Sequence, residues 1–124
     1  MRILLAGLAA AFSSACGGGV FAADEAGQEA FNNNCRTCHS WKKGDNRLGP
    51  NLNAIIGRKA AAAEGFGYSE AMKNSGITWD ESSLDKFIAN PNGFLPNNNM
   101  KPFTGIADAG TRKQIIDFLK SNPE

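Results

Sequence analysis

One short motif limits what this chain can fold into more than any other feature. Cys35 and Cys38 stand three residues apart, and His39, the only histidine among 124 residues, follows directly. The pattern C-x-x-C-H is typical of covalent haem attachment. Two thiols on one helical turn can add to the two vinyl groups along one side of a porphyrin, and the next residue places its imidazole under the iron. The motif therefore predicts one haem c, bound through Cys35 and Cys38.

Three other uses of these residues are less favoured. A structural zinc site wants four Cys or His ligands, and only three remain once an N-terminal leader is removed. A thioredoxin-like redox pair would begin a helix after a strand, in an α/β context that this sequence lacks. A simple disulfide would leave the adjacent histidine as a coincidence.

The first two dozen residues form a segment of their own. Arg2 supplies a positive start, residues 3–12 are apolar apart from small residues, and Val20-Phe21-Ala22 offers a small-residue cleavage site. This is the layout of a secretory signal peptide, and its apolar run is too short to cross a bilayer. We expect a signal peptide at 1–22, a mature domain at 23–124 and a periplasmic location. A retained N-terminal anchor is the less favoured alternative.

Cys16, which three glycines follow, raises a second alternative for this leader. It could be the acylated cysteine of a lipoprotein, with the glycines as a flexible tether. Ser13 stands where such sites usually have an aliphatic residue, so we favour the form without lipid.

The remaining 102 residues make one small domain. Without Arg2 it has 12 Lys plus Arg (13 less 1) against 12 Asp plus Glu. It has no basic tract of the kind that phosphate contacts need, which argues against nucleic-acid binding. It has no further apolar segment of membrane-spanning length either. We expect a monomer with no transmembrane segment in the mature chain.

A haem iron held by His39 needs a second axial ligand. No other histidine exists, so the thioether of a methionine is the natural candidate, and Met/His ligation raises the reduction potential. Met72 lies in a segment, 69–75, that is expected to be a short helix, where methionine is usually a core filler. Met100 lies in a proline-rich loop without helical periodicity. We favour Met100.

Helical signals occur in only part of the chain. We expect an amphipathic helix over 24–31, and Thr78-x-x-Glu81 predicts a capping box that opens a helix ending at Asn90-Pro91. A last helix should run from Ala109 or Thr111 to Lys120. Segments 40–67 and 90–108 are rich in Gly, Pro and Asn, and a haem could serve as the core around which they wrap. We expect an all-α fold of three to five short helices with long loops around one haem.

The sequence resembles the class I cytochromes c, the group of mitochondrial cytochrome c and its soluble bacterial relatives. The resemblance covers nearly the whole mature chain. The motifs that carry it, in order, are C-x-x-C-H at 35–39, GPNL at 49–52, GRK at 57–59, GFxY at 65–68, GITW at 76–79, Asn90-Pro91 and Met100 before Phe103-x-Gly105.

The resemblance implies roles for individual residues. His39 would be the proximal iron ligand, with its other ring nitrogen donating to the Pro50 carbonyl, and Met100 would be the distal ligand. Residues that bond to or surround the haem propionates are implied at Arg58, Tyr68 and Trp79. The terminal helices would cross where Gly27 and Phe31 meet Ile115 and Phe118.

The sequence departs from the mitochondrial pattern in three ways. Met100 and Phe103 are separated by one additional residue, and Phe87 stands where that family has a tyrosine. The basic ring around the haem edge is also thinner, with these candidates for a modest positive rim: Arg36, Lys42, Lys43, Arg47 and Lys101.

The resemblance implies a diffusible one-electron carrier rather than an enzyme. By family, its redox partners would be a cytochrome bc complex, a periplasmic dehydrogenase, a terminal oxidase or a photosynthetic reaction centre. The alternative is a haem enzyme or a gas- or peroxide-binding sensor whose methionine ligand can be displaced. No second histidine or acid/base cluster near the distal loop supports that alternative.

Overall fold

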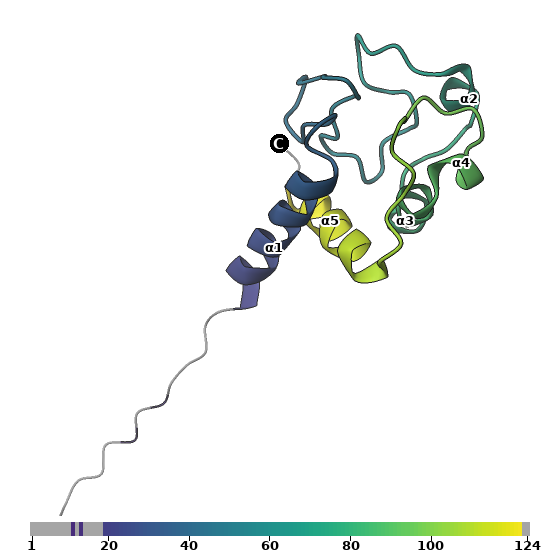
Figure 1. The fold of residues 1–124 in the computed structure, drawn as a ribbon. Helices are drawn as coiled ribbons and strands as arrows, with labels where there is room; N and C mark the ends of the chain where they lie inside the picture. The colour runs from purple at the N-terminus through teal and green to yellow at the C-terminus, as the bar shows by residue number, and fades with distance from the viewer. Residues whose placement is uncertain (1–10, 12, 14–18, 123–124) are drawn as a thin grey trace, which may run out of the picture.

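A computed structural model describes residues 11, 13 and 19–122, with the backbone alone for 19–23. Most of the predicted signal peptide, including Cys16, lies outside the described residues, so cleavage after Ala22 and acylation of Cys16 stay predictions. Within these residues the helices follow in this order (Figure 1): α1 Gly19–Asn34, α2 Glu70–Lys73, α3 Glu81–Ala89, α4 Pro91–Phe94 and α5 Ala109–Ser121. None of them, within the described ranges, is long and apolar enough to cross a membrane.

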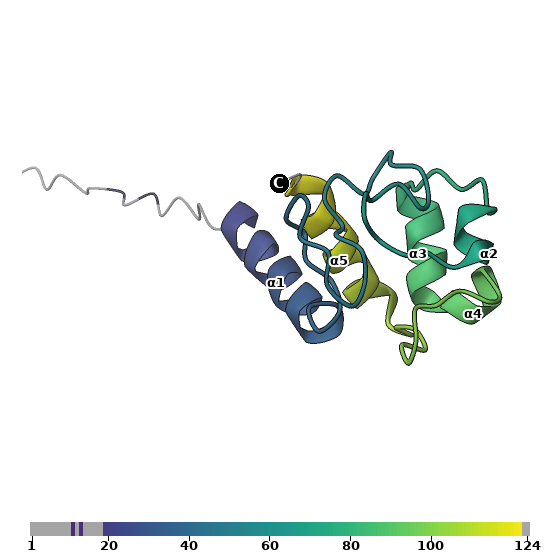
Figure 2. The ribbon, with the colours of Figure 1, turned by 90° about the horizontal axis from the view of Figure 1, so that it is seen from above.

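The predicted fold class is confirmed. The described part of the chain contains no β-sheet, only an isolated antiparallel bridge between Lys59 and Thr78. Helix α5 lies between α1 and α3, and two long loop segments connect the helices (Figure 2).

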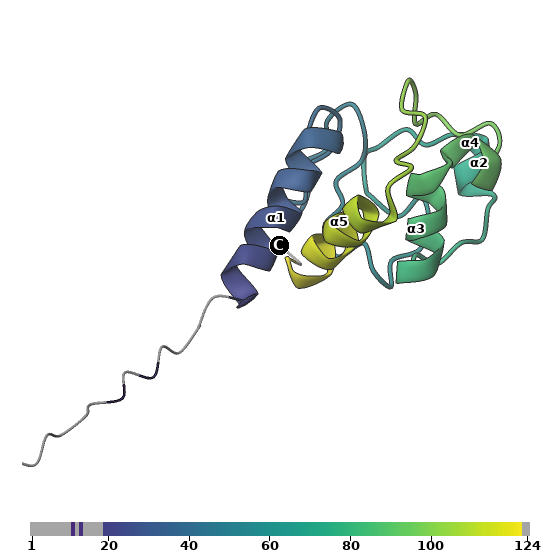
Figure 3. The same cartoon turned by 60° about the horizontal axis from the view of Figure 1, so that its bottom comes forward.

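Helices α1 and α5 cross closely (Figure 3), because Gly27 leaves room at the crossing. A Cβ on Gly27 would lie 2.8 Å from Phe118 Cβ and 2.9 Å from the Gln114 carbonyl oxygen. Phe31 and Ile115, both with 0 % exposure, belong to the same core. The crossing predicted at Gly27 is therefore present, and no larger residue would fit without moving a helix.

Trp41 adds an aromatic side chain from the first loop to this crossing. Its ring centroid lies 5.3 Å from that of Phe31 and 5.2 Å from that of Phe118, in both cases edge to face. Such geometry is the favoured arrangement for aromatic pairs. The loop after α1 is thus anchored on the two terminal helices.

The start of α3 differs from the sequence prediction. Its N-cap is Asp80, whose side chain accepts the Ser83 N–H at 2.7 Å, while the Ser83 hydroxyl accepts the Asp80 N–H at 2.9 Å. The capping box predicted at Thr78 and Glu81 is wrong. Trp79, the residue after Thr78, still pairs with the segment before it: its N–H donates to the Arg58 carbonyl and its carbonyl accepts the Gly57 N–H, so the helix begins only after Trp79.

Asn90 ends α3 as predicted, but the chain turns at once into α4, which the sequence analysis did not predict. Pro91 occupies the first turn, where its fixed φ suits a helix start, and the Asn90 side chain accepts the Gly93 N–H. Helix α5 begins at Ala109, the earlier of the two predicted starts. Its cap is Asp108, which accepts the Thr111 N–H at 2.8 Å, so Thr111 lies inside the first turn.

Backbone hydrogen bonds fold the first loop back onto the end of α1. The Gly49 N–H donates to the Cys38 carbonyl at 2.8 Å, and the Leu52 N–H donates to the Ser40 carbonyl at 2.8 Å. These bonds close the loop and bring Pro50 beside His39. Helices form some of the walls of a cavity beside His39, and the two long loop segments form the others.

Candidate functional site

One cavity of about 640 Å³ brings together all eight residues that the sequence analysis singled out. Its walls come from the end of α1, the two long loop segments, and the helices α2, α3 and α5. Its size falls within the range of roughly 300–1,000 Å³ that is usual for ligand and cofactor pockets. The eight predicted residues in its lining are Cys35, Cys38, His39, Pro50, Arg58, Tyr68, Trp79 and Met100.

The two cysteines occupy the turn that ends α1. The Cys35 N–H donates to the Phe31 carbonyl at 2.7 Å, and the His39 N–H donates to the Cys35 carbonyl at 2.9 Å, so the turn continues the helical path as far as His39. Neither cysteine is in a disulfide. Burial, and secondarily the charge of Cys38, raises the pKa of Cys35 to about 12, so this thiol is protonated at neutral pH.

His39 has one ring nitrogen engaged and the other available. Nδ1 lies 2.7 Å from the Pro50 carbonyl oxygen. Because a carbonyl can only accept, Nδ1 must carry the proton, which leaves Nε2 with its lone pair. Burial lowers the pKa of His39 and Arg58 acts in the same direction, whereas the bond to Pro50 opposes them. A neutral imidazole with a free Nε2 is the form that binds a metal.

Gly49 packs against the same ring. A Cβ at Gly49 would lie 2.8 Å from His39 Nδ1, so the imidazole packs directly on the glycine backbone. His39 is 7 % exposed. The ring is thereby fixed both by a hydrogen bond and by contact.

Arg58 places a buried cation at the wall of the cavity. Its Nη2 donates to the Asn51 carbonyl at 2.8 Å and its Nη1 to the Asn53 carbonyl at 2.9 Å. Its Nε is buried and has no hydrogen-bond partner among the described residues. Burial lowers the pKa of Arg58, yet a guanidinium stays protonated in proteins. A buried cationic donor with an unused N–H suits a carboxylate.

Tyr68 and Trp79 line the cavity with Arg58. The Tyr68 hydroxyl accepts the Ala63 N–H at 3.0 Å, which leaves its own proton free to donate. Backbone pairing joins Trp79 to Arg58, whose carbonyl accepts the Trp79 N–H at 2.9 Å. Trp79 is 5 % exposed, and its ring centroid lies 5.1 Å from that of Phe87. Phe87 stands where the mitochondrial family has a tyrosine, and it contacts its neighbours through its ring without a hydroxyl group.

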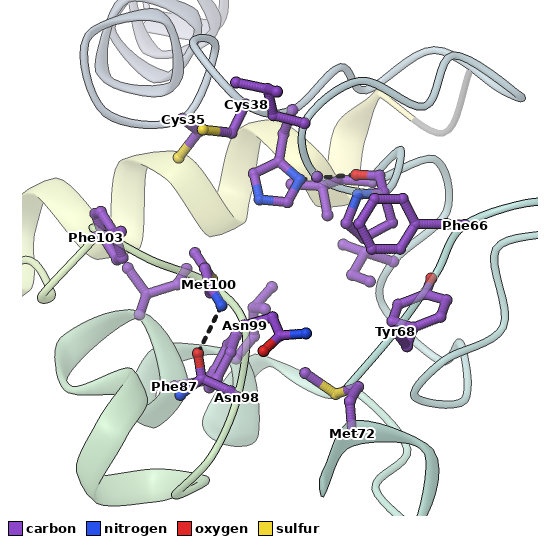
Figure 4. Close-up of a pocket in the computed structure, with 18 of the residues that line it drawn as sticks. Cys35, Cys38, Phe66, Tyr68, Met72, Phe87, Asn98, Asn99, Met100 and Phe103 are labelled. Carbon is purple, nitrogen blue, oxygen red and sulfur yellow. Dashed lines mark hydrogen bonds between the residues drawn. The ribbon is translucent and has the colours of Figure 1, made fainter. Parts of the chain in front are cut away.

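Both methionines considered as the distal ligand, Met72 and Met100, line this cavity. Figure 4 shows them on the side away from Cys35 and Cys38. Met72 lies on α2, whereas Met100 lies on the loop between α4 and α5. Phe103 lines the cavity as well, so the extra residue after Met100 does not turn Phe103 away from it.

Two cavity residues escaped the sequence analysis. Asn98 is 2 % exposed and donates and accepts hydrogen bonds next to Met100, but a run of three asparagines gave no sign of which one is buried. Leu48 lines the cavity and is 78 % exposed. Among the described residues it is the one large hydrophobic side chain that is exposed. A single leucine beside Gly49 carries no sequence signal of its own.

All five residues of the proposed positive rim are exposed, and one of them forms an ion pair. Arg36, Lys42, Lys43 and Lys101 are exposed. Arg47 is exposed too but pairs with Asp45 at 3.0 Å, which offsets its charge. Lys101 is the member of this set that also lines the cavity.

The residues of this cavity fit a haem. Two free thiols and a histidine with an available nitrogen lie together at one end. A buried arginine N–H without a partner suits a propionate, and the rest of the lining is largely aliphatic and aromatic. The chain thus offers attachment, ligation and charge compensation for the same group.

Comparison with known proteins agrees with this geometry. Residues 25–123 match the cytochrome c family. Cytochrome c2 iso-2 of Magnetospirillum fulvum is 41 % identical over 87 residues, which are 70 % of this chain and 90 % of that protein. The cytochrome c-type cyt cy of Rhodobacter capsulatus is 40 % identical over 80 % of this chain, which spans about half (49 %) of that longer protein.

A solved structure shows the same fold. Cytochrome cH from Methylobacterium extorquens superposes with a TM-score of 0.73 and 38 % identity, over 80 % of this chain and 98 % of that one. The family match covers the cavity from Cys35 to Met100. The chain therefore belongs to the cytochrome c family, whose members are haem-containing electron carriers rather than enzymes.

Proposed function

We propose that this chain is a periplasmic one-electron carrier whose haem c is attached through Cys35 and Cys38 and ligated by His39 and Met100. The observation that carries the proposal is the single cavity in which these four residues meet. When bound, the haem supplies the one-electron redox chemistry. The protein supplies attachment, ligation, burial and a docking face.

His39 is suited to stay on the metal in both oxidation states. Its Nδ1–H bond to Pro50 and its contact with Gly49 hold the ring in one orientation. Such a partner on the second nitrogen also increases the basicity of the ligating one. Little reorganisation is then needed when the charge changes, which favours fast electron transfer.

Met100 is the better candidate for the opposite ligand. It lies on an irregular loop, and its backbone N–H is held by the side chain of buried Asn98. Met72 lies on the four-residue helix α2, a regular element in which methionine is usually a core filler. Both methionines pack against the core cluster, so the preference for Met100 rests on its loop and on its bond to Asn98. Two firmly held ligands leave no open coordination position, which suits a carrier better than a gas sensor.

The haem propionates are assigned to the wall that Arg58, Tyr68 and Trp79 form. Arg58 offers its unpartnered Nε–H, and Tyr68 offers its hydroxyl proton. A buried carboxylate without partners is costly, so these donors lower the cost of enclosing the propionates. The positive charge of Arg58 would also raise the potential of the iron.

Partners would dock at the exposed cavity edge. A reduced donor gives one electron, and the carrier later passes that electron to an oxidised acceptor, so no atom is transferred. Lys101 and Leu48 line the cavity and are exposed, giving the edge one cation and one apolar contact. Weak docking through small interfaces is typical of electron-transfer pairs. A bc complex, a dehydrogenase, a terminal oxidase and a reaction centre are the partner classes of this proposal.

Optical spectra of the ferric holoprotein test the ligand assignment. We expect a sulfur-to-iron charge-transfer band at the red end that is lost in Met100→Leu and retained in Met72→Leu. The converse pattern would overturn the assignment of Met100.

Two further measurements separate the carrier from its alternatives. The native ferrous protein should not bind carbon monoxide readily at neutral pH, whereas rapid stoichiometric binding would favour a sensor. The mass of the mature N-terminus tests the location. A chain that begins at Ala23 agrees with a secreted form, and a lipid on Cys16 would show a membrane-tethered one.

A further inference from the structure

The most deeply buried polar side chain near the distal loop is that of Asn98. It is 2 % exposed, and of the described polar residues only His39, Ser40 and Asn51 are also buried. A buried amide costs free energy unless its hydrogen bonds are satisfied. In this chain both the oxygen and the nitrogen of the Asn98 amide have hydrogen-bond partners. The partners of the nitrogen precede Asn98 in the chain, and the partner of the oxygen follows it.

The Asn98 amide joins α4 to the backbone of Met100. Its Oδ1 accepts the Met100 N–H at 2.8 Å. Its Nδ2 donates to the Leu95 carbonyl at 2.9 Å and to Asn92 Oδ1 at 3.3 Å, both in or just after α4. The side chain therefore spans the turn that carries the chain from α4 to Met100, and Figure 4 shows its bond to Met100.

The backbone of this turn depends on the same contacts. Asn97 has a φ of +66°, in the left-handed region, which an asparagine tolerates better than most residues. The Asn98 N–H donates to the Leu95 carbonyl at 3.3 Å, so that oxygen receives both the backbone and the side chain of Asn98. Without the amide, one weak backbone bond would be left to hold the turn.

We propose that Asn98 is a positioning residue that keeps Met100 in place for ligation by fixing its backbone to α4. The inference rests on the proposed role of Met100 and adds a cause for the strength of that ligand. A methionine on a rigid turn returns to the iron after each transient dissociation. A methionine on a loosened turn spends more time away, and an external ligand then competes more successfully.

Imidazole titration of the ferric holoprotein measures this competition. Replacing Asn98 by alanine removes all three side-chain hydrogen bonds. We expect the apparent Kd for imidazole to fall about tenfold, which corresponds to about 1.4 kcal/mol. Asn98→Ser keeps a short hydroxyl acceptor that can reach an N–H two residues on, so it should give a smaller change. The charge-transfer band of Asn98→Ala should also weaken.

Three control variants separate positioning from general loss of stability. Asn99→Ala removes a neighbouring amide that also lines the cavity but makes no side-chain hydrogen bond among the described residues, so it should change imidazole binding less than Asn98→Ala does. Ile116→Val lowers stability in the buried face of α5, away from the cavity lining, and should also leave imidazole binding unchanged. Asn92→Ala removes only the 3.3 Å bond and should have a small effect.

The outcomes distinguish this inference from the ligand assignment. Equal imidazole affinities in Asn98→Ala, Asn98→Ser and Asn99→Ala would overturn the positioning role and leave Met100 as the ligand. A charge-transfer band that survives in Met100→Leu would overturn the ligand assignment itself. If Asn98→Ala does not fold, Asn98→Ser and Asn92→Ala provide the test, and both binding imidazole like the wild type would refute the proposal.

Discussion

The imidazole of His39 packs directly on the backbone of Gly49. A Cβ at Gly49 would come within 2.8 Å of His39 Nδ1, the atom that bonds to the Pro50 carbonyl. The residue after Gly49 therefore supplies the hydrogen bond, and Gly49 itself supplies the space for the ring. The GP motif at 49–50 thus positions His39 by two separate contacts.

Gly49→Ala should displace the His39 ring and lengthen its bond to Pro50. We expect the free energy of unfolding of the holoprotein to fall by about 1–3 kcal/mol, the usual cost of overpacking, as measured by urea titration. Gly67→Ala is the matched control, because a Cβ there would meet nothing within 4 Å and its φ is not positive. Equal losses in the two variants would contradict the contact with His39.

Arg58 should influence both stability and the reduction potential. In Arg58→Met the carbonyls of Asn51 and Asn53 lose their donor, and each buried group left unsatisfied costs about 1–3 kcal/mol. The potential should fall as well, because a positive charge beside the haem favours the ferrous form. Urea titration and a redox titration measure the two effects.

Arg58→Lys separates charge from geometry at this position. The lysine keeps the charge but lacks the planar fork that reaches both carbonyls. We expect a loss of stability with a potential closer to that of the wild type. A potential as low as that of Arg58→Met would show that the charge is not the cause.

Gly27→Ala should destabilise the protein although alanine is the better helix former. The gain in helix propensity is about 1 kcal/mol at most, whereas the new Cβ would lie 2.8 Å from Phe118 Cβ and 2.9 Å from the Gln114 carbonyl. We expect a net loss of about 1–3 kcal/mol on thermal or urea unfolding. Gly110→Ala in α5 is the control, since its Cβ would meet only Asp108 Oδ2 at 3.4 Å, and it should not destabilise the protein.

Asp108 should make the stability of α5 dependent on pH in the acid range. Hydrogen bonds from the Thr111 hydroxyl and then from the Thr111 backbone N–H lower the pKa of Asp108. Its stabilisation is therefore complete above the unfolded-state pKa of about 3.9 and is lost as the pH falls through the lower folded-state value.

Asp108→Asn tests this dependence, because asparagine caps a helix about as well as aspartate but does not titrate. The variant should be close to the wild type in stability at pH 7. Below a pH of about 4 it should lose less stability than the wild type on urea unfolding. Parallel pH profiles for the two proteins would show that the Asp108 charge contributes nothing to the cap.

The sequence alone identified the haem site where the residues that form it are adjacent in the chain. The five residues 35–39 carry both thiols and the imidazole on one turn, so the haem motif could be identified without a fold. Helix α5 was predicted because its apolar residues share one face, with its start left between Ala109 and Thr111. The all-helical class followed from the absence of strand alternation together with these helices.

Predictions failed where a distant segment competes for a residue. Thr78 resembles an N-cap by its spacing to Glu81, but the next residue, Trp79, still pairs with Arg58 through its backbone, and the helix is capped by Asp80 instead. Helix α4 was missed because Pro91 was taken as an end, although proline also suits a first helical turn. Asn98 could not be chosen from three identical neighbours.

The sequence by itself determined the covalent attachment, the class of the fold and the family, because each depends on residues at fixed spacing along the chain. Only the tertiary structure decided that Gly49 packs on His39, that Arg58 has an unpartnered buried N–H, and that the Asn98 amide holds the turn before Met100. These features depend on contacts between side chains and backbone that loop closure creates. The spacing of residues along the chain does not predict which loop residues will come into contact after folding.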